Sequence, residues 1–197
     1  MPVFPVFLKL SGRRVLLVGG GRVAAGKLRG LLAAGARVTV VAPEILPDIA
    51  AAPVTLVRRP FDPGHLAGVC YVVSAAPREV NAAVAREADA RGLFVNAVDD
   101  VENASAYAGA TLRRAGVTIA ISTAGDAPAL AGLLREALEV VLPDDLDAWM
   151  ECARASRPRW LAAGVPMDER RPLLLEALVG LYRTDASTPT PDGAHAS

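Results

Sequence analysis

The first 123 residues alternate short, nearly continuous apolar runs with longer stretches in which apolar residues recur at helical spacing. Six apolar runs predict strands, and they lie at 14–18, 37–41, 54–59, 70–76, 93–100 and 117–123. The intervening stretches at 23–36 and 79–92 predict helices, and Gly35 is placed to end the first one. Because strands alternate with helices, we expect an α/β fold with a doubly wound parallel sheet of the Rossmann type.

The pattern changes after Pro128, where only helical spacing remains. We expect one amphipathic helix up to Pro143 and further helices between 144 and 183. The last residues, TDASTPTPDGAHAS, are polar and rich in turn-forming types, so we expect them to be disordered. The predicted organisation is a Rossmann domain over 1–112, a strand–helix segment over 113–143, a small helical domain over 144–183 and a tail over 184–197.

Composition and charge narrow the choice of partners. Of the 197 residues, 52% are hydrophobic and only 5% are aromatic, which suits close packing of helices on a sheet. Lysine and arginine together number 21, as do aspartate and glutamate, so the chain lacks the basic surplus typical of nucleic-acid-binding domains. Any anionic ligand must therefore be bound by a local cluster of positive charge.

Metal sites, disulfide frameworks and membrane spans are not expected. Cys70 and Cys152 are far apart and neither belongs to a CxxC pair, and His65 and His195 are equally isolated. The N-terminus contains prolines and no long apolar segment of the signal-peptide type. No run of about 18 apolar residues is free of charges and of Gly or Pro. We expect a cytoplasmic protein.

A glycine-rich turn joins the first predicted strand to the first predicted helix. In VLLVGGGRVAAGK, Gly19, Gly21 and Ala24 form a G-x-G-x-x-A pattern. The first glycine permits a tight turn, the second lets the backbone approach a pyrophosphate, and the alanine allows close helix–strand packing. The helix start, with Arg22 and Val23, would present N–H groups to the phosphates. A glycine turn without a ligand is the alternative, but the strand–turn–helix–strand context favours a dinucleotide.

The end of the second strand departs from the usual dinucleotide site. An acidic residue is expected there to bind the ribose hydroxyls, but Ala42 and Pro43 occupy the position and Glu44 comes two residues late. Arg37 begins this strand instead of ending it, so it offers no clamp for a 2′-phosphate. The sequence favours NAD slightly over NADP, with Ala42 and Pro43 beside the ribose.

Several segments together carry a family resemblance. The segment FPVFLKLSGRRVLLVGGGRVAAGKLRGLLAAGARVTVVAPE, and then RRPF, VNAVDD, RRAGVTIAISTAGDAPALAGLLREALE and the closing Leu142-Pro143, closely resemble the siroheme synthase N-terminal domain family. That family comprises precorrin-2 dehydrogenases, some of which are also sirohydrochlorin ferrochelatases. The resemblance covers residues 4–143, and the length matches the stand-alone form, because fused synthases carry an additional methyltransferase domain.

The resemblance implies a reaction and a catalytic residue. Precorrin-2 would lose a hydride to NAD and a proton to the protein, giving sirohydrochlorin, and bifunctional members then insert Fe(II). Asp99 in VNAVDD matches the proton acceptor, and it follows a parallel strand, where open sheets bind ligands. A loop or cap carboxylate is the alternative. Asp100, if still on the strand, would point away. The family also implies a homodimer formed through 113–143.

The remaining candidates carry alternatives of their own. Asn96 would orient the cofactor or the Asp99 loop, or else is a buried amide bonded to backbone; Ala75 stands where the family has Ala-Thr near the cofactor. Thr123 and Gly125 mark a turn whose amides would bind anionic groups, although a capping turn with Asp126 as N-cap explains much of it without a ligand. Arg113 and Arg114 would bind the carboxylates of the macrocycle, or else form a solvated pair.

Two further observations bear on the function. The stretch ASAYAGA at 104–110 lacks the family's Cys, Phe and Pro, so the pocket wall that matters for chelation differs. The rival class is a non-catalytic NAD(H)-binding regulatory module. Such sensors usually keep the acid that closes the second strand, and this chain lacks it.

Overall fold

The computed structural model describes residues 3–185, which form two compact units. The first unit contains the chain up to Ala110 together with Ser122–Ala131, and the second contains Thr111–Ile121 and the chain from Gly132 onward. The segment 122–131 thus returns to the first unit after the predicted boundary at 112. His195 and most of the predicted tail lie outside the described residues, although the last helix extends to Asp185.

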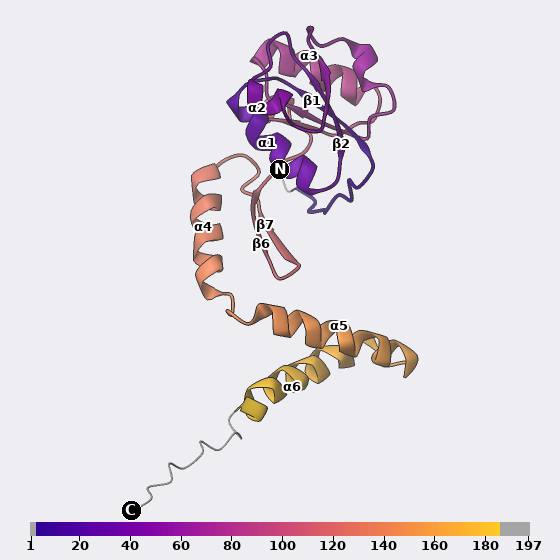
Figure 1. Ribbon diagram of the computed structural model, residues 1–197, viewed down its shortest axis with the longest axis vertical. Helices are drawn as coiled ribbons and strands as arrows, with labels where there is room; N and C mark the ends of the chain where they lie inside the picture. The colour runs from indigo at the N-terminus through magenta and orange to yellow at the C-terminus, as the bar shows by residue number, and fades with distance from the viewer. Residues whose placement is uncertain (1–2, 186–197) are drawn as a thin grey trace, which may run out of the picture. The chain divides into compact units, whose positions relative to one another are not determined.

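The first unit is built on a five-stranded parallel sheet (Figure 1). Its strands are β1 (Arg14–Val18), β2 (Arg37–Val41), β3 (Thr55–Val57), β4 (Tyr71–Ser74) and β5 (Val95–Ala97). They lie in the order β3-β2-β1-β4-β5, which confirms the Rossmann-type prediction. The order changes direction between β1 and β4, and in open sheets this switch point is where ligands bind.

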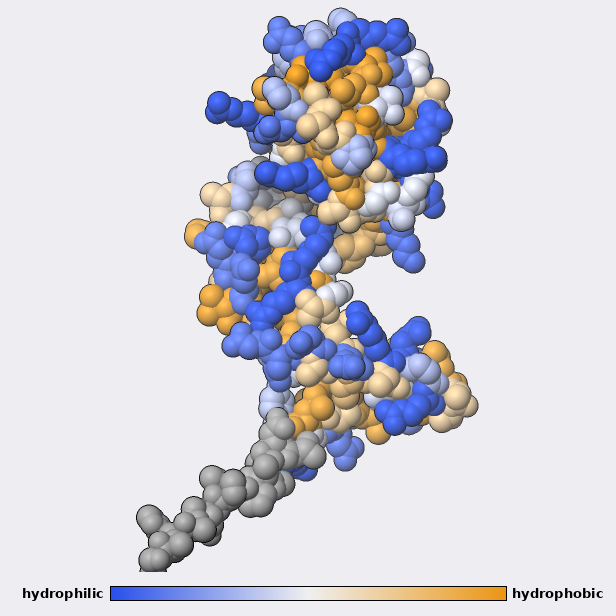
Figure 2. Space-filling model, viewed as in Figure 1, coloured by the Kyte–Doolittle hydropathy of each residue, from blue (hydrophilic) through white to orange (hydrophobic). Residues whose placement is uncertain are grey.

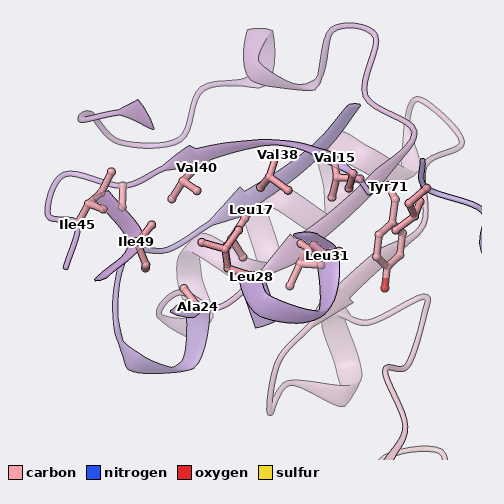
Figure 3. Close-up of a cluster of buried hydrophobic side chains, with 14 residues drawn as sticks. Val15, Leu17, Ala24, Leu28, Leu31, Val38, Val40, Ile45, Ile49 and Tyr71 are labelled. Carbon is pink, nitrogen blue, oxygen red and sulfur yellow. The ribbon is translucent and has the colours of Figure 1, made fainter. Parts of the chain in front are cut away.

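Helices cover both faces of this sheet. Helices α1 (Arg22–Ala33) and α2 (Pro47–Ala50) pack on one face, and α3 (Arg78–Asp89) packs on the other. Val15 and Leu17 of β1 enter the α1 face together with Leu28 (Figure 3), whereas Leu16 and Val18 enter the α3 face. Both faces of the strand are therefore buried, which explains why the first strand reads as a continuous apolar run. Gly35 ends α1 with a φ of +73°, as predicted.

The sixth apolar run forms a strand that lies outside the parallel sheet. Strand β7 (Val117–Ile121) pairs instead with β6 (Ala110–Arg114) in a separate two-stranded sheet. Ala115 and Gly116 join the two strands with φ values of +50° and +80°, the conformation of a tight hairpin turn. No residue of β7 is fully buried, whereas strands buried inside a parallel sheet lose nearly all exposure.

Three helices follow the hairpin. They are α4 (Pro128–Val141), α5 (Leu146–Ala162) and α6 (Met167–Asp185). Helices α5 and α6 pack together, and the Trp149 Nε1 donates to the Tyr182 hydroxyl at 2.7 Å. Within residues 3–185 no helix is both long and apolar enough to cross a membrane. The short 3₁₀ segments η1 (Pro63–Leu66) and η2 (Val101–Asn103) complete the first unit.

Candidate functional site

A pocket of about 320 Å³ lies at the carboxyl ends of β4 and β5 in the first unit. Helix α1 contributes Val23, and the segment after β4 contributes Ala75 and Ala76. Helix α3 and the loop after β5 complete the wall with Asn81, Asp99 and Asp100, among others. The pocket therefore lies at the switch point between β1 and β4, where the topology predicts a ligand.

The first two glycines of the turn are required by packing. Gly19 has a φ of +118°, and a Cβ built on it would lie 2.3 Å from the carbonyl oxygen of Ala75. A Cβ on Gly20 would lie 2.0 Å from the carbonyl oxygen of Glu44. Both approaches are far shorter than a carbon–oxygen contact, so neither position accepts a side chain. These two glycines hold β1, β4 and the segment after β2 close together.

Gly21 differs, because nothing in the fold requires it to be glycine. Its φ is −89°, which any residue adopts, and a Cβ built there would meet nothing within 4 Å. It is the N-cap of α1 and makes no side-chain cap bond. Among the described residues, no acceptor is bonded to the N–H groups of 22–24, which open the helix. Open space above free amides at a helix start fits a pyrophosphate.

Around the glycine turn, exposed residues that a dinucleotide can reach alternate with buried residues that hold the turn on the sheet. Val23 is half exposed and lines the pocket, whereas Ala24 is fully buried against the sheet. Ala42 is buried at the end of β2, and its N–H donates to the Val57 carbonyl at 3.1 Å. Pro43 is exposed beside it. The end of β2 therefore presents no charged side chain at the position where an acid is usual.

Asp99 lies in a strained loop at the mouth of the pocket. Strand β5 ends at Ala97, so Asp99 and Asp100 both belong to the loop, and both line the pocket. The expectation that Asp100 points away is therefore wrong, because it assumed a longer strand. Asp99 is exposed and has a φ of +57°, a left-handed conformation that costs a non-glycine residue about 1–3 kcal/mol. Strain of this kind is typical of functional loops.

A buried hydrogen-bond network holds this loop. Asn81 is almost fully buried in α3, and its Oδ1 accepts from the Ser74 hydroxyl at 2.6 Å. Its Nδ2 lies 3.3 Å from Oδ2 of Asp100, which also accepts from Nδ2 of Asn103 at 2.9 Å. The Asn103 bond, helped by Asn81 and by the charge of Arg78, lowers the pKa of Asp100. Asp100 therefore stays ionised and fixed, and it leaves Asp99 as the more exposed carboxylate.

Asn96 occupies the middle of β5 with only half of its amide paired. It is buried, and its Nδ2 donates to the Ala106 carbonyl at 3.0 Å. Its Oδ1 is buried and has no partner among the described residues. An unpaired buried oxygen costs about 1–3 kcal/mol, so the fold keeps an acceptor here that its own residues do not use.

The predicted turn at 123–125 is a packed capping turn. The Ala127 N–H donates to Oγ1 of Thr123 at 3.1 Å, and α4 begins at the next residue. Ala127 is thus the residue before the helix, and the expectation of Asp126 as N-cap is wrong. Gly125 has a φ of +91°, and a Cβ there would lie 2.7 Å from Cγ2 of Val101. This glycine packs the turn against η2, so its contacts are internal to the first unit.

Arg114 is already engaged in the second unit. Its guanidinium donates to the carbonyl oxygens of Leu142 and Pro143 and lies 3.4 Å from a carboxylate oxygen of Asp144. The arginine therefore caps the C-terminal end of α4, where cations are favourable. A role of Arg114 in binding a substrate would require these bonds to break. Arg113, on the same strand, is exposed.

Comparisons with known proteins identify the family. A family model described as putative NAD(P)-binding matches residues 6–110. The chain belongs to this NAD(P)-binding family. Siroheme synthase 1 of Aeromonas salmonicida (strain A449) is 44% identical over 176 residues, covering 87% of this chain and 38% of that protein. Siroheme synthase of Photorhabdus laumondii is 40% identical and covers 92% of this chain and 40% of that protein.

A solved structure gives a match over most of the fold. The structure of SirC, precorrin-2 dehydrogenase, superposes with a TM-score of 0.69 at 27% identity, covering 88% of each chain. This NAD(P)-binding chain spans about two fifths of the length of the curated siroheme synthases named above. Together these matches confirm the resemblance to the siroheme synthase N-terminal domain and the prediction of NAD as the cofactor.

Two residues that line this pocket are not predicted as site residues from the sequence. Asn81 falls within a predicted helix, and it shares the buried face of α3 with Val84 and Ala88. A polar residue at that spacing on an apolar face is the signal that could have revealed it. The sequence predicts a strand that includes Asp100, whereas β5 ends at Ala97 and leaves Asp100 in the pocket wall. Within residues 3–185, no three His, Cys, Asp or Glu side chains are grouped to hold a metal ion.

Proposed function

We propose that the chain oxidises precorrin-2 to sirohydrochlorin with NAD as the electron acceptor. The observation that carries this proposal is the juxtaposition, in one pocket, of the open helix start at Val23 and the strained carboxylate of Asp99. The likeness to SirC, precorrin-2 dehydrogenase, over 88% of both chains supports the choice of substrate. The likeness to siroheme synthases supports the same pathway step.

The oxidation removes a hydride and a proton from precorrin-2, and the cofactor and the protein each accept one of them. Precorrin-2 and NAD⁺ give sirohydrochlorin, NADH and one proton. NAD supplies the acceptor for the hydride, which carries both electrons. The carboxylate of Asp99 takes the proton that leaves the macrocycle, a role that needs an ionised and accessible group within reach of the substrate. Asp100 fits this role less well, because two amides already occupy one of its oxygens.

The residues of the glycine turn would bind the cofactor. The N–H groups of Arg22, Val23 and Ala24 bind the pyrophosphate, and Gly21 leaves room for its approach. Ala75 forms the wall beneath, where its small side chain and its contact with Gly19 keep the cleft narrow. We assign to Asn96 the orientation of the loop that carries Asp99, because its side chain is buried in β5 and its Nδ2 donates to the Ala106 carbonyl.

The carboxylates of the macrocycle need positive charge, and exposed Arg113 can supply it. Arg114 can do so only if it leaves the end of α4. Insertion of Fe(II), as a second substrate, would use the same proton acceptor, since two pyrrole protons must leave. We place these reactions in the cytoplasm.

A second copy of this chain is the proposed partner. Helix α4 exposes several large apolar side chains (Figure 2), and the most exposed are Leu133 at 64%, Val140 at 86% and Val141 at 75%. Exposed apolar surface of this kind is typical of subunit interfaces. We expect a homodimer by analytical ultracentrifugation, and Leu133→Glu should shift it to monomer. A monomeric wild-type protein at all concentrations would contradict this partner.

The deciding experiment is an anaerobic assay of purified protein with precorrin-2 and NAD⁺, following sirohydrochlorin and NADH by absorption. We expect turnover, and a loss of about 10²–10⁴-fold in Asp99→Ala. Asp89→Ala removes an exposed carboxylate at the end of α3 and should keep full activity. The same variants, assayed with sirohydrochlorin and Fe(II), test the chelatase step.

The outcomes separate the alternatives. Full dehydrogenase activity in Asp99→Ala would contradict the role of Asp99. A folded protein that binds NAD by calorimetry but changes no tetrapyrrole spectrum would be the regulatory module instead of the enzyme.

A further inference from the structure

Arg78 is the only positively charged side chain among the described residues that line the pocket. The other charged residues of the pocket wall are the carboxylates Asp99 and Asp100. Negative charge therefore exceeds positive charge in this wall, and it opposes the approach of a polyanion to Asp99. A macrocycle with many carboxylates needs a cation here if it is to reach that residue.

The guanidinium of Arg78 has a single hydrogen-bond partner in the described part of the chain. Its Nη2 donates to Oε2 of Glu102, which belongs to η2, and the two side chains are 70% and 77% exposed. An exposed ion pair of this kind contributes little to stability, because water solvates both charges. One bond to one oxygen also leaves the other N–H groups of the guanidinium available. Arg78 can therefore exchange Glu102 for another carboxylate at little cost in free energy.

The position of Arg78 in α3 does not favour a cation. Arg78 is the first residue of this helix and directly follows the N-cap, Pro77. The N-terminal end of a helix carries a partial positive charge, so an acidic residue is favourable there and a basic one is not. Glu79 supplies the acidic residue at the next position. Helix α3 gains nothing from the charge of Arg78, which indicates that this side chain serves the pocket.

The backbone that carries Arg78 is tied to the loop that carries Asp99. Oδ1 of Asn81, which is almost fully buried, accepts from the Ala76 N–H at 3.4 Å, just before α3 begins. Nδ2 of the same side chain lies 3.3 Å from Oδ2 of Asp100. Arg78 and Asp99 thus enter the pocket wall from two segments that one buried amide holds together.

We propose that Arg78 binds a carboxylate of the macrocycle, giving up Glu102 as it does so, and thereby holds precorrin-2 against Asp99. The proposal rests on the proposed function and adds a substrate-binding residue to it. A guanidinium suits this task, because it binds a carboxylate through two parallel N–H bonds. The exchange of partners moves no proton and no electron, so Arg78 positions the substrate and leaves the chemistry to Asp99 and the cofactor.

Two measurements test this role. Anaerobic titration with sirohydrochlorin, followed by the absorption of the macrocycle, gives the affinity without a reaction, and steady-state kinetics with precorrin-2 and NAD⁺ give KM and kcat. The variants are Arg78→Ala, Arg78→Lys and Glu102→Gln. Arg86→Ala is the matched control, because it removes an exposed arginine of the same helix that does not line the pocket. Circular dichroism establishes that each variant is folded.

The expected effects are selective for the macrocycle. Arg78→Ala should weaken sirohydrochlorin binding and raise the KM for precorrin-2 by about ten- to one-hundred-fold, while kcat and NAD⁺ affinity change less than about threefold. Arg78→Lys keeps the charge but loses the paired bonds, so its loss should be about three- to tenfold. Glu102→Gln removes the competing carboxylate and should bind sirohydrochlorin about two- to fivefold more tightly. Arg86→Ala should match the wild type.

Several results would overturn the proposal. They are a wild-type affinity for sirohydrochlorin in Arg78→Ala, an equal loss in Arg86→Ala, a loss of NAD⁺ affinity alone, and a wild type that binds no sirohydrochlorin. An unchanged affinity in Glu102→Gln would overturn the exchange of partners. A wild type that binds sirohydrochlorin through Arg78 but does not oxidise precorrin-2 would contradict the proposed function and leave the binding role of Arg78 in place.

Discussion

The side-chain amide of Asn81 lies 3.3 Å from the carboxylate of Asp100, and this contact ties α3 to the loop after β5. The other end of the same amide accepts from the Ser74 hydroxyl, which is fully buried at the end of β4. One side chain therefore joins the end of β4 to the loop that carries Asp99. Asn81 therefore acts on the position of Asp99, the proposed proton acceptor, through its neighbour Asp100.

Replacing Asn81 by leucine keeps the volume and removes both polar ends. We expect a loss of about 1–3 kcal/mol in the free energy of unfolding, because the Ser74 hydroxyl then stays buried without its partner. Urea denaturation followed by circular dichroism measures it. Asn103→Ala removes only the partly exposed bond to Asp100 and should cost about 1 kcal/mol or less. Equal losses in the two variants would show that the buried hydrogen bond between Ser74 and Asn81 adds nothing to the free energy of unfolding.

The lowered pKa of Asp100 predicts a pH dependence of stability. Its hydrogen bond from Asn103 favours the charged form in the folded state, so the folded pKa lies below the ordinary aspartate value of 3.8. The stabilisation is then present above pH 3.8 and is lost as the pH falls through the lower, folded value. Urea midpoints measured from pH 7 to pH 3 should fall more steeply for the wild type than for Asp100→Asn. Parallel curves would contradict the shift.

The glycine turn offers a matched pair of substitutions. Gly19→Ala should destabilise the protein by at least about 1–3 kcal/mol, because its φ is +118° and the new Cβ meets a carbonyl oxygen. Gly21→Ala should cost only about 1 kcal/mol as an N-cap change, yet weaken NAD binding about tenfold or more. Thermal unfolding and calorimetry separate the two effects. Unchanged NAD affinity in Gly21→Ala would place the pyrophosphate elsewhere.

The backbone of Asp99 predicts a conflict between stability and activity. Asp99→Gly relieves the left-handed strain, so the free energy of unfolding of this variant should equal that of the wild type or exceed it by up to about 1 kcal/mol. Asp99→Val should lose about 1–2 kcal/mol, because a β-branched residue resists a φ of +57°. Both variants should lose dehydrogenase activity. A stable and fully active Asp99→Gly would show that the loop conformation serves another purpose.

Arg114 is expected to act on stability. Arg114→Ala removes the donor to the carbonyls at the end of α4 and should cost about 1–2 kcal/mol, while NAD affinity stays at the wild-type level. Arg113→Ala should change stability by less than about 0.5 kcal/mol, as is usual for exposed side chains. Differential scanning calorimetry compares the two. An unchanged transition in Arg114→Ala would return this arginine to the list of candidate carboxylate binders.

Much of the first unit could be predicted from the sequence because its signals are local. A strand buried on both faces must be apolar throughout, so β1 and β2 were recognisable with their bounds. The turn between β1 and α1 needs glycine for steric reasons, and Gly19 shows this directly. Gly35 ended its helix for the same kind of reason. The fold class and the dinucleotide site follow from these local requirements.

The rest depended on pairings between distant segments, which periodicity does not encode. The run at 117–123 has a composition that suits a strand inside a parallel sheet or a strand of a hairpin. Only its pairing with β6 decides between the two. The length of β5 decided whether Asp100 faces the pocket, and the partners of Arg114 lie 28 and 29 residues away. The sequence by itself determined the dinucleotide-binding fold; the tertiary structure decided which side chains line the pocket, because those contacts exist only after strands far apart in the chain have paired.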